Sequence, residues 1–175
     1  MIKLIIGAVI AVFVVIGGFM IMDPNINVTS SSEVADANKF KYTIEGEISK
    51  PGTYSLEEEI TLGDLINAAG GITYNADERA YYDNAVVTAG NAYYIPIKYD
   101  IGDVCNNNEI SKVNLNTASA SELKTISGVT SSIADAIVEY RVSNGNYSLI
   151  EQLMNVYGIG SATYRKIRNY VILHE

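Results

Sequence analysis

The chain has 175 residues and a formal net charge of −8, with 48% hydrophobic and 18% charged residues. This composition is ordinary for folded protein and excludes a wholly disordered chain, while the length allows at most two small domains with attachments. The single cysteine, Cys105, excludes an internal disulfide.

The acidic side chains are concentrated in the middle of the chain. Residues 39–110 carry twelve acidic and five basic side chains, whereas residues 111–175 carry five acidic and six basic ones. An acidic protein normally repels nucleic acid, but the C-terminal third is slightly basic. The overall charge therefore does not exclude a nucleic-acid partner for that third.

An uncharged apolar stretch, residues 4–22, reads LIIGAVIAVFVVIGGFMIM. A helix of this length spans roughly 28 Å, close to the hydrocarbon thickness of a bilayer. A cleaved secretory signal is the alternative, but its apolar region is usually about 7–15 residues long and ends in an A-x-A-like site. No such site follows Met22. We therefore expect residues 1–22 to form an uncleaved transmembrane anchor.

The few charges around this stretch predict its orientation. Lys3 and the amino terminus precede it, whereas Asp23, Glu33 and Asp36 follow it. The positive-inside rule then leaves the N-terminus cytoplasmic and the remaining chain outside the cell membrane, which is crossed once. Residues 23–38 are polar and lack periodicity, which predicts a linker.

The first folded unit is expected at residues 39–98. Residues 41–48, KYTIEGEI, alternate apolar and polar side chains, which indicates a half-buried strand, and KPGTYSL adds a turn and a second strand. The run TLGDLINAAGG predicts a helix that is capped by Thr61 and stopped by its two final glycines. Apolar runs at residues 85–87 and 92–97 predict further short strands.

The KPGxY turn, the LxDLIxxAGG helix and the closing YxP-like strand together resemble the soluble-ligand-binding β-grasp (SLBB) domain, over residues 39–98. The resemblance implies a small mixed domain and, by its name, a small ligand. The sequence offers little chemistry for one. The acidic run Glu57, Glu58 and Glu59 is interpreted as a solvated turn rather than as a cation site.

Four tyrosines form two adjacent pairs, Tyr81–Tyr82 and Tyr93–Tyr94. One interpretation is an exposed patch for protein contacts, because tyrosine offers a large contact area. The other is that one member of each pair belongs to the core. The residues that follow, 99–111, are polar and predict a second linker, which contains Cys105.

The last third, residues 112–175, contains an internal repeat of helical segments. Two S-x-x-E sequences, which start at Ser119 and Ser148, have the form of a capping box. Each predicts a short helix, followed by a glycine hairpin and a longer helix. Gly128 and Gly158 occupy equivalent places, so we expect two copies of helix, hairpin and helix in an all-α domain.

In the second copy, the longer helix is expected over TYRKIRNYV, with Tyr164, Ile167 and Val171 on one apolar face. Arg165, Lys166 and Arg168 would lie off that face.

The glycines have a structural and a functional explanation. Tight hairpins need residues that adopt positive φ, which glycine does without a steric cost. In addition, the amides of a hairpin and of the following helix start can bind a phosphate. The predicted contact residues are Gly128, Val129, Thr130 and Ser131 in the first hairpin, Gly158, Ile159, Gly160 and Ser161 in the second, and the cations Arg165, Lys166 and Arg168.

The segments VNLNTAS, AxAIxxYR and IEQLMNVYGIG resemble the tandem helix-hairpin-helix domain of ComEA-type competence DNA receptors. The order of anchor, β-grasp domain and helix-hairpin-helix domain resembles the membrane-anchored form typical of Gram-positive bacteria. The resemblance implies an α+β protein that binds extracellular double-stranded DNA without sequence preference. Its implied partners are double-stranded DNA, the cytoplasmic membrane and the DNA-uptake channel proteins of natural transformation.

The sequence departs from this family at two places. Thr130 stands where the family usually has the second glycine of GIG, which implies weaker phosphate binding at the first hairpin. Ser161 and Ala162 stand where relatives often carry a lysine, so this domain is less basic. Since one weakly basic module would profit from neighbours on the same membrane, we also expect self-association through residues 39–110.

Two other functions stay open. The protein could be an envelope scaffold whose β-grasp and helix-hairpin-helix domains bind protein or polysaccharide. An enzyme is not expected, because His174 is the only histidine and no nucleophile-and-base pair or metal-ligand spacing occurs. We expect no catalytic residues, no metal and no cofactor.

Overall fold

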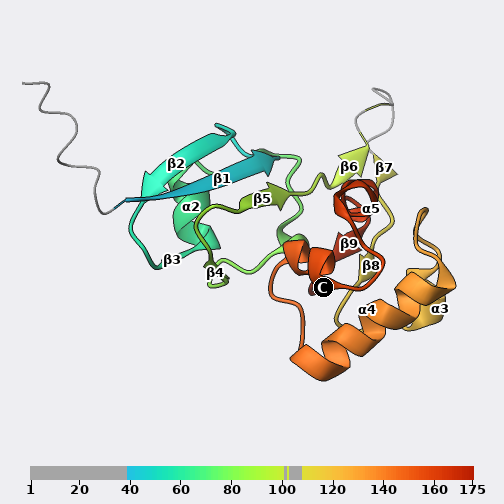
Figure 1. The fold of residues 1–175 in the computed structure, drawn as a ribbon. Helices are drawn as coiled ribbons and strands as arrows, with labels where there is room; N and C mark the ends of the chain where they lie inside the picture. Colours follow the sequence, from blue (N-terminus) through green and yellow to red (C-terminus); the bar gives the residue numbers. More distant parts are fainter. Residues whose placement is uncertain (1–38, 101, 103–107) are drawn as a thin grey trace, which may run out of the picture. The chain divides into compact units, whose positions relative to one another are not determined.

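A computed structural model describes residues 39–100, 102 and 108–175 (Figure 1). Within the chain, Asn38–Glu175 form one compact unit. The predicted anchor at residues 1–22, the linker at residues 23–38 and Cys105 lie outside the described residues. In the described ranges, no helix combines the length and the apolar character needed to cross a bilayer.

The β-grasp domain is built around strand β1 (Phe40–Gly46), the central strand of a three-stranded sheet. Strand β2 (Gly52–Leu56) pairs antiparallel with one side of β1, and strand β5 (Ala92–Ile95) pairs parallel with the other. Tyr42 and Ile44 are fully buried, which confirms the predicted alternation. Strand β5 therefore forms an edge of this sheet (Figure 1).

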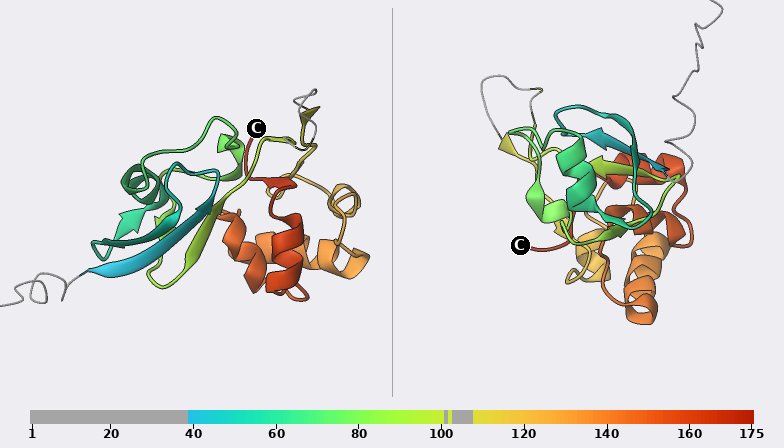
Figure 2. Two further views of the ribbon diagram at one scale, coloured as in Figure 1. Left: turned by 90° about the horizontal axis from the view of Figure 1, so that it is seen from above. Right: turned by 90° about the vertical axis from the view of Figure 1, so that its left-hand side faces the viewer.

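Helix α2 (Leu62–Ala68) follows the predicted pattern and lies against one face of the sheet (Figures 1 and 2). The Thr61 hydroxyl accepts a hydrogen bond from the Asp64 amide, and the Asp64 carboxylate accepts one from the Thr61 amide. Both amides at the helix start are thus satisfied. The helix ends before two glycines with positive φ, and its core-facing residues are Leu62, Leu65, Ile66 and Ala69.

Several short elements complete this part of the chain. The carboxylates of Glu57, Glu58 and Glu59 lie on an exposed turn, as interpreted from the sequence. The predicted linker at residues 99–111 contains two short paired strands where it is described. The elements are β3 (Ile60–Thr61), η1 (Glu78–Ala80), β4 (Val86–Val87), β6 (Tyr99–Asp100) and β7 (Asn108–Glu109).

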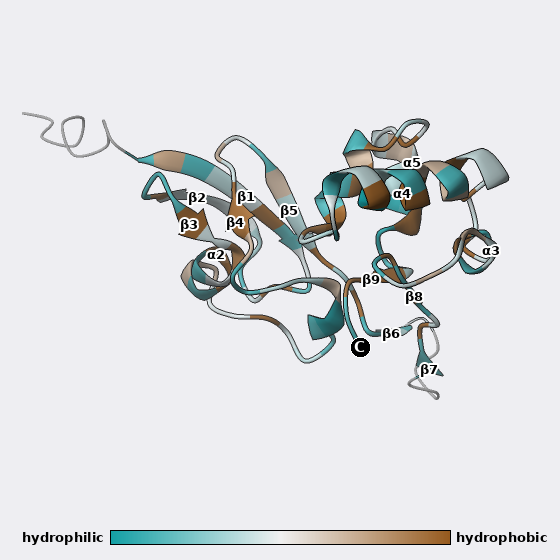
Figure 3. Ribbon diagram, turned by 90° about the horizontal axis from the view of Figure 1, so that it is seen from below, coloured by the Kyte–Doolittle hydropathy of each residue, from teal (hydrophilic) through white to brown (hydrophobic). Residues whose placement is uncertain are grey.

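The C-terminal part contains the two predicted copies of helix, hairpin and helix around a second core. Along its longest helix, hydrophobic residues alternate with hydrophilic ones (Figure 3). The first hairpin, residues 126–130, joins the first two helices, and the second hairpin, residues 156–160, joins the last two. The helices are α3 (Ala120–Leu123), α4 (Ser131–Asn144), the 3₁₀ helix η2 (Ile150–Asn155) and α5 (Ser161–Ile167).

One predicted capping box is confirmed and the other is wrong. The Glu122 carboxylate accepts a hydrogen bond from the Ser119 amide at 2.8 Å, as predicted. At the start of η2, however, the side-chain oxygen of Gln152 accepts from the amides of Ser148 and Leu149. The 3₁₀ helix begins one residue later than the S-x-x-E sequence predicts, which leaves Glu151 free for other contacts.

The expectation of an all-α domain is corrected by a parallel pair of strands, β8 (Val113–Asn114) and β9 (Val171–Ile172). Helix α5 ends at Ile167, so Val171 does not extend its apolar face. Val171 is nevertheless fully buried. Its spacing from Tyr164 and Ile167 fits a helix, but backbone pairing between the two ends of the domain sets its conformation.

Candidate nucleic-acid interface

Each of the two hairpins packs against a helix of the opposite copy. A Cβ placed on Gly128 of the first hairpin would lie 3.8 Å from Cδ of Lys166 on α5. A Cβ placed on Gly158 of the second hairpin would lie 3.4 Å from Cγ1 of Ile133 on α4. Both glycines have positive φ, +98° and +88°, so the tight turns account for them structurally.

The middle residue of each hairpin anchors it in the core. Val129 and Ile159 are 7% and 5% exposed, and their amides donate to Ile126 and Val156 within the turns. Neither the side chains nor the amides of these two predicted contact residues are therefore available to a phosphate. The other predicted hairpin residues are exposed, namely Gly128, Thr130, Ser131, Gly158, Gly160 and Ser161.

Gly160 differs from the other two hairpin glycines. Its φ of −93° and ψ of 177° are accessible to any residue, and a Cβ placed on it would have no neighbour within 4 Å. The equivalent residue of the first hairpin, Thr130, adopts φ −80° and ψ 168° and carries a full side chain. Folding therefore does not require a glycine at position 160. A missing side chain there leaves room for a ligand to approach the backbone.

The starts of α4 and α5 differ in how their amides are satisfied. The Thr130 hydroxyl accepts a hydrogen bond from the Ile133 amide at 3.3 Å and so caps α4. Gly160 occupies the same position before α5 and supplies no side-chain cap. The amide equivalent to that of Ile133 receives no side-chain cap at the start of α5. The second hairpin therefore offers one more backbone donor to a ligand than the first.

The exposed cations of α5 are Arg165 and Lys166, in its last turn. The aliphatic stem of Lys166 passes beside Gly128, so this cation from the second copy lies at the first hairpin. Sequence reasoning missed two further candidates. Lys124 is exposed just before the first hairpin, and the Tyr157 side chain is 85% exposed beside Gly158. Their adjacency to the hairpin glycines was the available signal.

Arg168, the third predicted cation, lies elsewhere. Its guanidinium carbon is 3.4 Å from the centroid of the Tyr94 ring, and its Nη1 is 3.9 Å from the Glu45 carboxylate. Its side chain is 21% exposed. The structure thus brings Lys166 to the first hairpin and directs Arg168 toward the β-grasp domain, while Arg165 is exposed and lines a hollow with Ser161 and Arg168.

Glu151 connects the same elements. Its Oε1 accepts hydrogen bonds from the Tyr94 amide at 2.8 Å and from the Tyr164 hydroxyl at 3.0 Å. Burial raises the pKa of Glu151, and these two hydrogen bonds and the charge of Arg168 oppose that rise only in part. Burial and the neighbouring Glu151 also raise the pKa of Tyr164.

The paired tyrosines divide between the two cores. Tyr81 and Tyr93 are buried in the β-grasp domain, so one member of each pair is core. Tyr82 and Tyr94 are half-buried against the C-terminal core, and Tyr82 stacks on His174 with ring centroids 4.8 Å apart. These two rings thus contact this chain itself and do not form an unpartnered patch.

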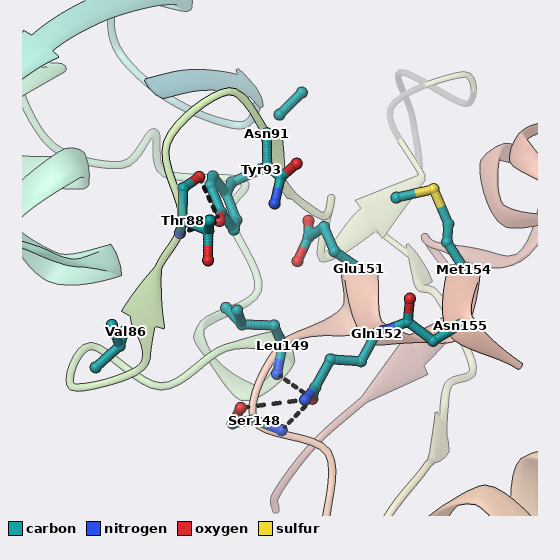
Figure 4. Close-up of a pocket in the computed structure, with 11 residues that line it drawn as sticks. Val86, Thr88, Asn91, Tyr93, Ser148, Leu149, Glu151, Gln152, Met154 and Asn155 are labelled. Atoms are coloured by element: carbon teal, nitrogen blue, oxygen red, sulfur yellow. Dashed lines mark hydrogen bonds between the residues drawn. The ribbon is translucent and has the colours of Figure 1, made fainter. Parts of the chain in front are cut away.

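A crevice of about 430 Å³ lies between β5 and η2. The Glu151 side chain points into it toward Asn91, and Gln152 forms its capping bonds on one wall (Figure 4). None of the described residues that line the crevice is a lysine or arginine, so it is unsuited to a phosphate. Its lining residues are Val86, Thr88, Asn91, Ala92, Tyr93, Ser148, Leu149, Glu151, Gln152, Met154 and Asn155.

Two protein families match this chain in separate segments. The family described as "Helix-hairpin-helix motif" matches residues 108–172, which contain both hairpins. The family described as "SLBB domain" matches residues 41–88, which contain β2 to β4 and all of β1 except Phe40.

Individual relatives extend these matches. "ComE operon protein 1" of Bacillus subtilis (strain 168) is 33% identical over 137 residues, or 73% of this chain and 67% of that protein. An uncharacterized protein of Haemophilus influenzae is 48% identical over 62 residues, 35% of this chain and 55% of its own length. A Xenopus laevis protein, "Endonuclease/exonuclease/phosphatase family domain-containing protein 1", is 40% identical over 57 residues, 33% of this chain but only 10% of its own length.

The Bacillus protein carries most weight because its match spans two thirds of both chains, and both domain families occur in the order expected from the sequence. The chain belongs to the ComEA-type family of competence DNA-binding proteins.

Proposed function

We propose that this protein is a membrane-anchored receptor that binds double-stranded DNA outside the cytoplasm, without sequence preference, for uptake in natural transformation. Gly160 carries this proposal. It lacks a side chain where neither backbone conformation nor packing forbids one, at the end of the hairpin that leads into α5, whose last turn carries the exposed cations Arg165 and Lys166. Close approach of a nucleic-acid backbone is the function that such a glycine supports best.

The expected contacts are to phosphates. The backbone amides around Gly160 donate hydrogen bonds, while Arg165 and Lys166 supply charge. Contacts of this kind position a duplex but carry no direct information about its bases. We therefore expect duplexes of unrelated sequence to bind alike.

Fluorescence anisotropy with the full chain in mild detergent tests this part of the proposal. With roughly three phosphates neutralised, the log–log dependence of affinity on salt should have a slope of roughly −3. Removal of residues 111–175 should abolish binding. Strong preference for one duplex sequence, or binding that survives this truncation, would contradict the assignment.

Anchoring and orientation rest on the uncharged stretch at residues 4–22 and on the charges around it. The single cysteine, Cys105, gives a direct test in intact cells. A membrane-impermeant maleimide should label it, and Cys105→Ser should abolish the signal. Labelling only after cell lysis would place the domains in the cytoplasm and contradict the orientation. The uptake channel is the proposed recipient of the DNA, and crosslinking from Cys105 during uptake would identify it.

A second candidate function is an envelope scaffold that binds a neutral polysaccharide. The crevice between β5 and η2 favours it, because amide and hydroxyl side chains line it without a cation. A glycan screen of the full chain tests this alternative, and loss of a hit in Asn91→Ala would locate the site. The match to the Xenopus protein covers a tenth of that protein, so it carries no enzymatic activity over to this chain.

Self-association through residues 39–110 stays a proposal. Half of the tyrosines that motivated it, Tyr82 and Tyr94, contact the chain's own C-terminal core. Analytical ultracentrifugation with and without long DNA tests the idea, and a strictly monomeric protein in both conditions would contradict it.

A further inference from the structure

Both arms of the second hairpin are tied to strand β5 of the β-grasp domain. One arm is η2, whose Glu151 accepts a hydrogen bond from the Tyr94 amide. The other arm is α5, whose Tyr164 donates to the same carboxylate oxygen. Arg168, the C-cap of α5, covers the Tyr94 ring. One residue of β5 thus contacts both segments that hold the hairpin.

We infer that Tyr94 and Glu151 are positioning residues for DNA binding, and that the β-grasp domain holds the second hairpin in its binding geometry. The inference rests on the proposed function, and it assigns to the β-grasp domain a part in DNA binding that needs no contact with DNA. A preformed hairpin binds more tightly because its ordering cost is met before DNA arrives.

The contacts in this cluster are strong enough to hold the arms. Glu151 is half-buried, and its Oε1 accepts from both the Tyr94 amide and the Tyr164 hydroxyl, so its removal leaves two donors without a partner. The guanidinium of Arg168 is largely shielded from water over the Tyr94 ring, where a cation–π contact is most favourable. Loss of the ring would therefore also release the end of α5.

The first hairpin lacks an equivalent support. In the part of the chain that the structure describes, no hydrogen bond connects the β-grasp domain to α3 or α4. The contacts of Tyr94 and Glu151 therefore act directly on the second hairpin, and their effect reaches the first hairpin only where Gly128 packs against α5.

The experiment compares DNA affinity of full-chain variants by anisotropy, at a temperature where circular dichroism shows each to be folded. Tyr94→Ala and Glu151→Ala should each lose about fivefold in affinity. Tyr94→Phe keeps the ring and Glu151→Gln keeps the acceptor oxygen, so each should bind DNA with the affinity of the unmodified protein. Tyr74→Ala removes a tyrosine that is 86% exposed in the same domain and should bind like the unmodified protein.

A double-mutant cycle tests the specificity for the second hairpin. In a Gly160→Ala background, whose second hairpin is already impaired, Tyr94→Ala should change affinity less than twofold. In a Thr130→Asp background, which alters only the first hairpin, it should keep its fivefold effect. Equal losses in both backgrounds would overturn the inference.

Amide hydrogen exchange without DNA gives a readout that is independent of binding. Exchange at residues 156–161 should accelerate in Tyr94→Ala and Glu151→Ala, while exchange at residues 126–131 should accelerate less. If Tyr94→Ala fails to fold, Glu151→Ala carries the test. An unmodified chain that does not bind DNA would refute the proposed function, whereas variants that bind normally, with unchanged exchange, would refute only this inference.

Discussion

The guanidinium carbon of Arg168 lies 3.4 Å from the centroid of the Tyr94 ring. This contact joins the end of α5 in the helix-hairpin-helix domain to β5, an edge strand of the β-grasp domain. It turns Arg168 toward the β-grasp domain, although Arg165 and Lys166, which occur within the same four positions of the sequence, are exposed. The salt dependence of DNA binding should reveal this division.

Arg165→Ala and Lys166→Ala should each flatten the log–log salt slope by about one unit, because each removes one phosphate contact. Arg168→Ala should leave the slope unchanged and lower affinity equally at every salt concentration. Anisotropy titrations over a range of sodium chloride concentrations measure both quantities. Lys50→Ala, an exposed change in the β-grasp domain, serves as the control. A flatter slope in Arg168→Ala would mean that Arg168 contacts phosphate in the complex.

Gly160→Asp should abolish DNA binding without unfolding the protein. Aspartate is a better N-cap than glycine, so the free energy of unfolding should rise by about 0.3 kcal/mol, while the carboxylate repels phosphate. Gly158→Ala should instead destabilise the protein by about 1 kcal/mol, because its φ is +88°. Urea unfolding and anisotropy separate the two outcomes. Normal DNA binding by folded Gly160→Asp would refute the assignment of this hairpin.

Thr130→Gly should make the first hairpin resemble the second. The change removes the hydroxyl that accepts from the Ile133 amide and frees that amide for a phosphate. We expect DNA affinity to rise about threefold, at a cost of a few tenths of a kcal/mol in stability. Thr130→Ser keeps the cap and is the matched control. Unchanged affinity in Thr130→Gly would show that the first hairpin does not contact DNA.

Asp77 should make stability depend on pH in the acid range. Its buried carboxylate bonds Arg79 and lies 2.9 Å from the ammonium of Lys112, whose side chain is 1% exposed. Burial raises the pKa of Asp77, but the hydrogen bonds from Arg79 and Lys112 outweigh it and lower the pKa from 3.8 to about 2. Because the pKa is lower in the folded state, the ionised carboxylate stabilises the fold at pH values above 3.8, the pKa of the unfolded chain. This stability is lost as pH falls toward about 2.

Asp77→Asn should therefore lose about 3 kcal/mol at neutral pH, since it leaves a buried ammonium without an anion, and should flatten the acid dependence. Urea titrations from pH 7 downward measure both effects. Asp135→Asn changes an exposed carboxylate on α4 and should alter neither. If Asp77→Asn kept the stability of the unmodified chain, Lys112 would have to be neutral or solvated.

The sequence predicted features that depend on near neighbours. The burial of Tyr42 and Ile44 followed from alternation along one strand, and the cap at Thr61 from residues three positions apart. Gly128 and Gly158 were recognised in the same way, because positive φ is a local requirement.

Features that depend on distant contacts were missed. Glu151 was assigned to a local cap, but its carboxylate bonds Tyr94, 57 positions away. Arg168 was assigned to DNA because it was expected to lie off the apolar face of its helix, but its stacking partner lies in the other domain. No periodicity reports such pairs, since they arise only when two separately folded cores pack together.

The parallel pairing of β8 with β9 has a mechanical consequence. The amides of Val113 and Leu115 donate to Tyr170 and Ile172, so backbone hydrogen bonds connect the end of the second copy directly to the strand that leads back to the β-grasp domain. Tension on a duplex held at the second hairpin would pass through α5 and β9 into β8 and bypass α3 and α4. The second hairpin is thus the part of the helical pair best placed to bear a pulling force.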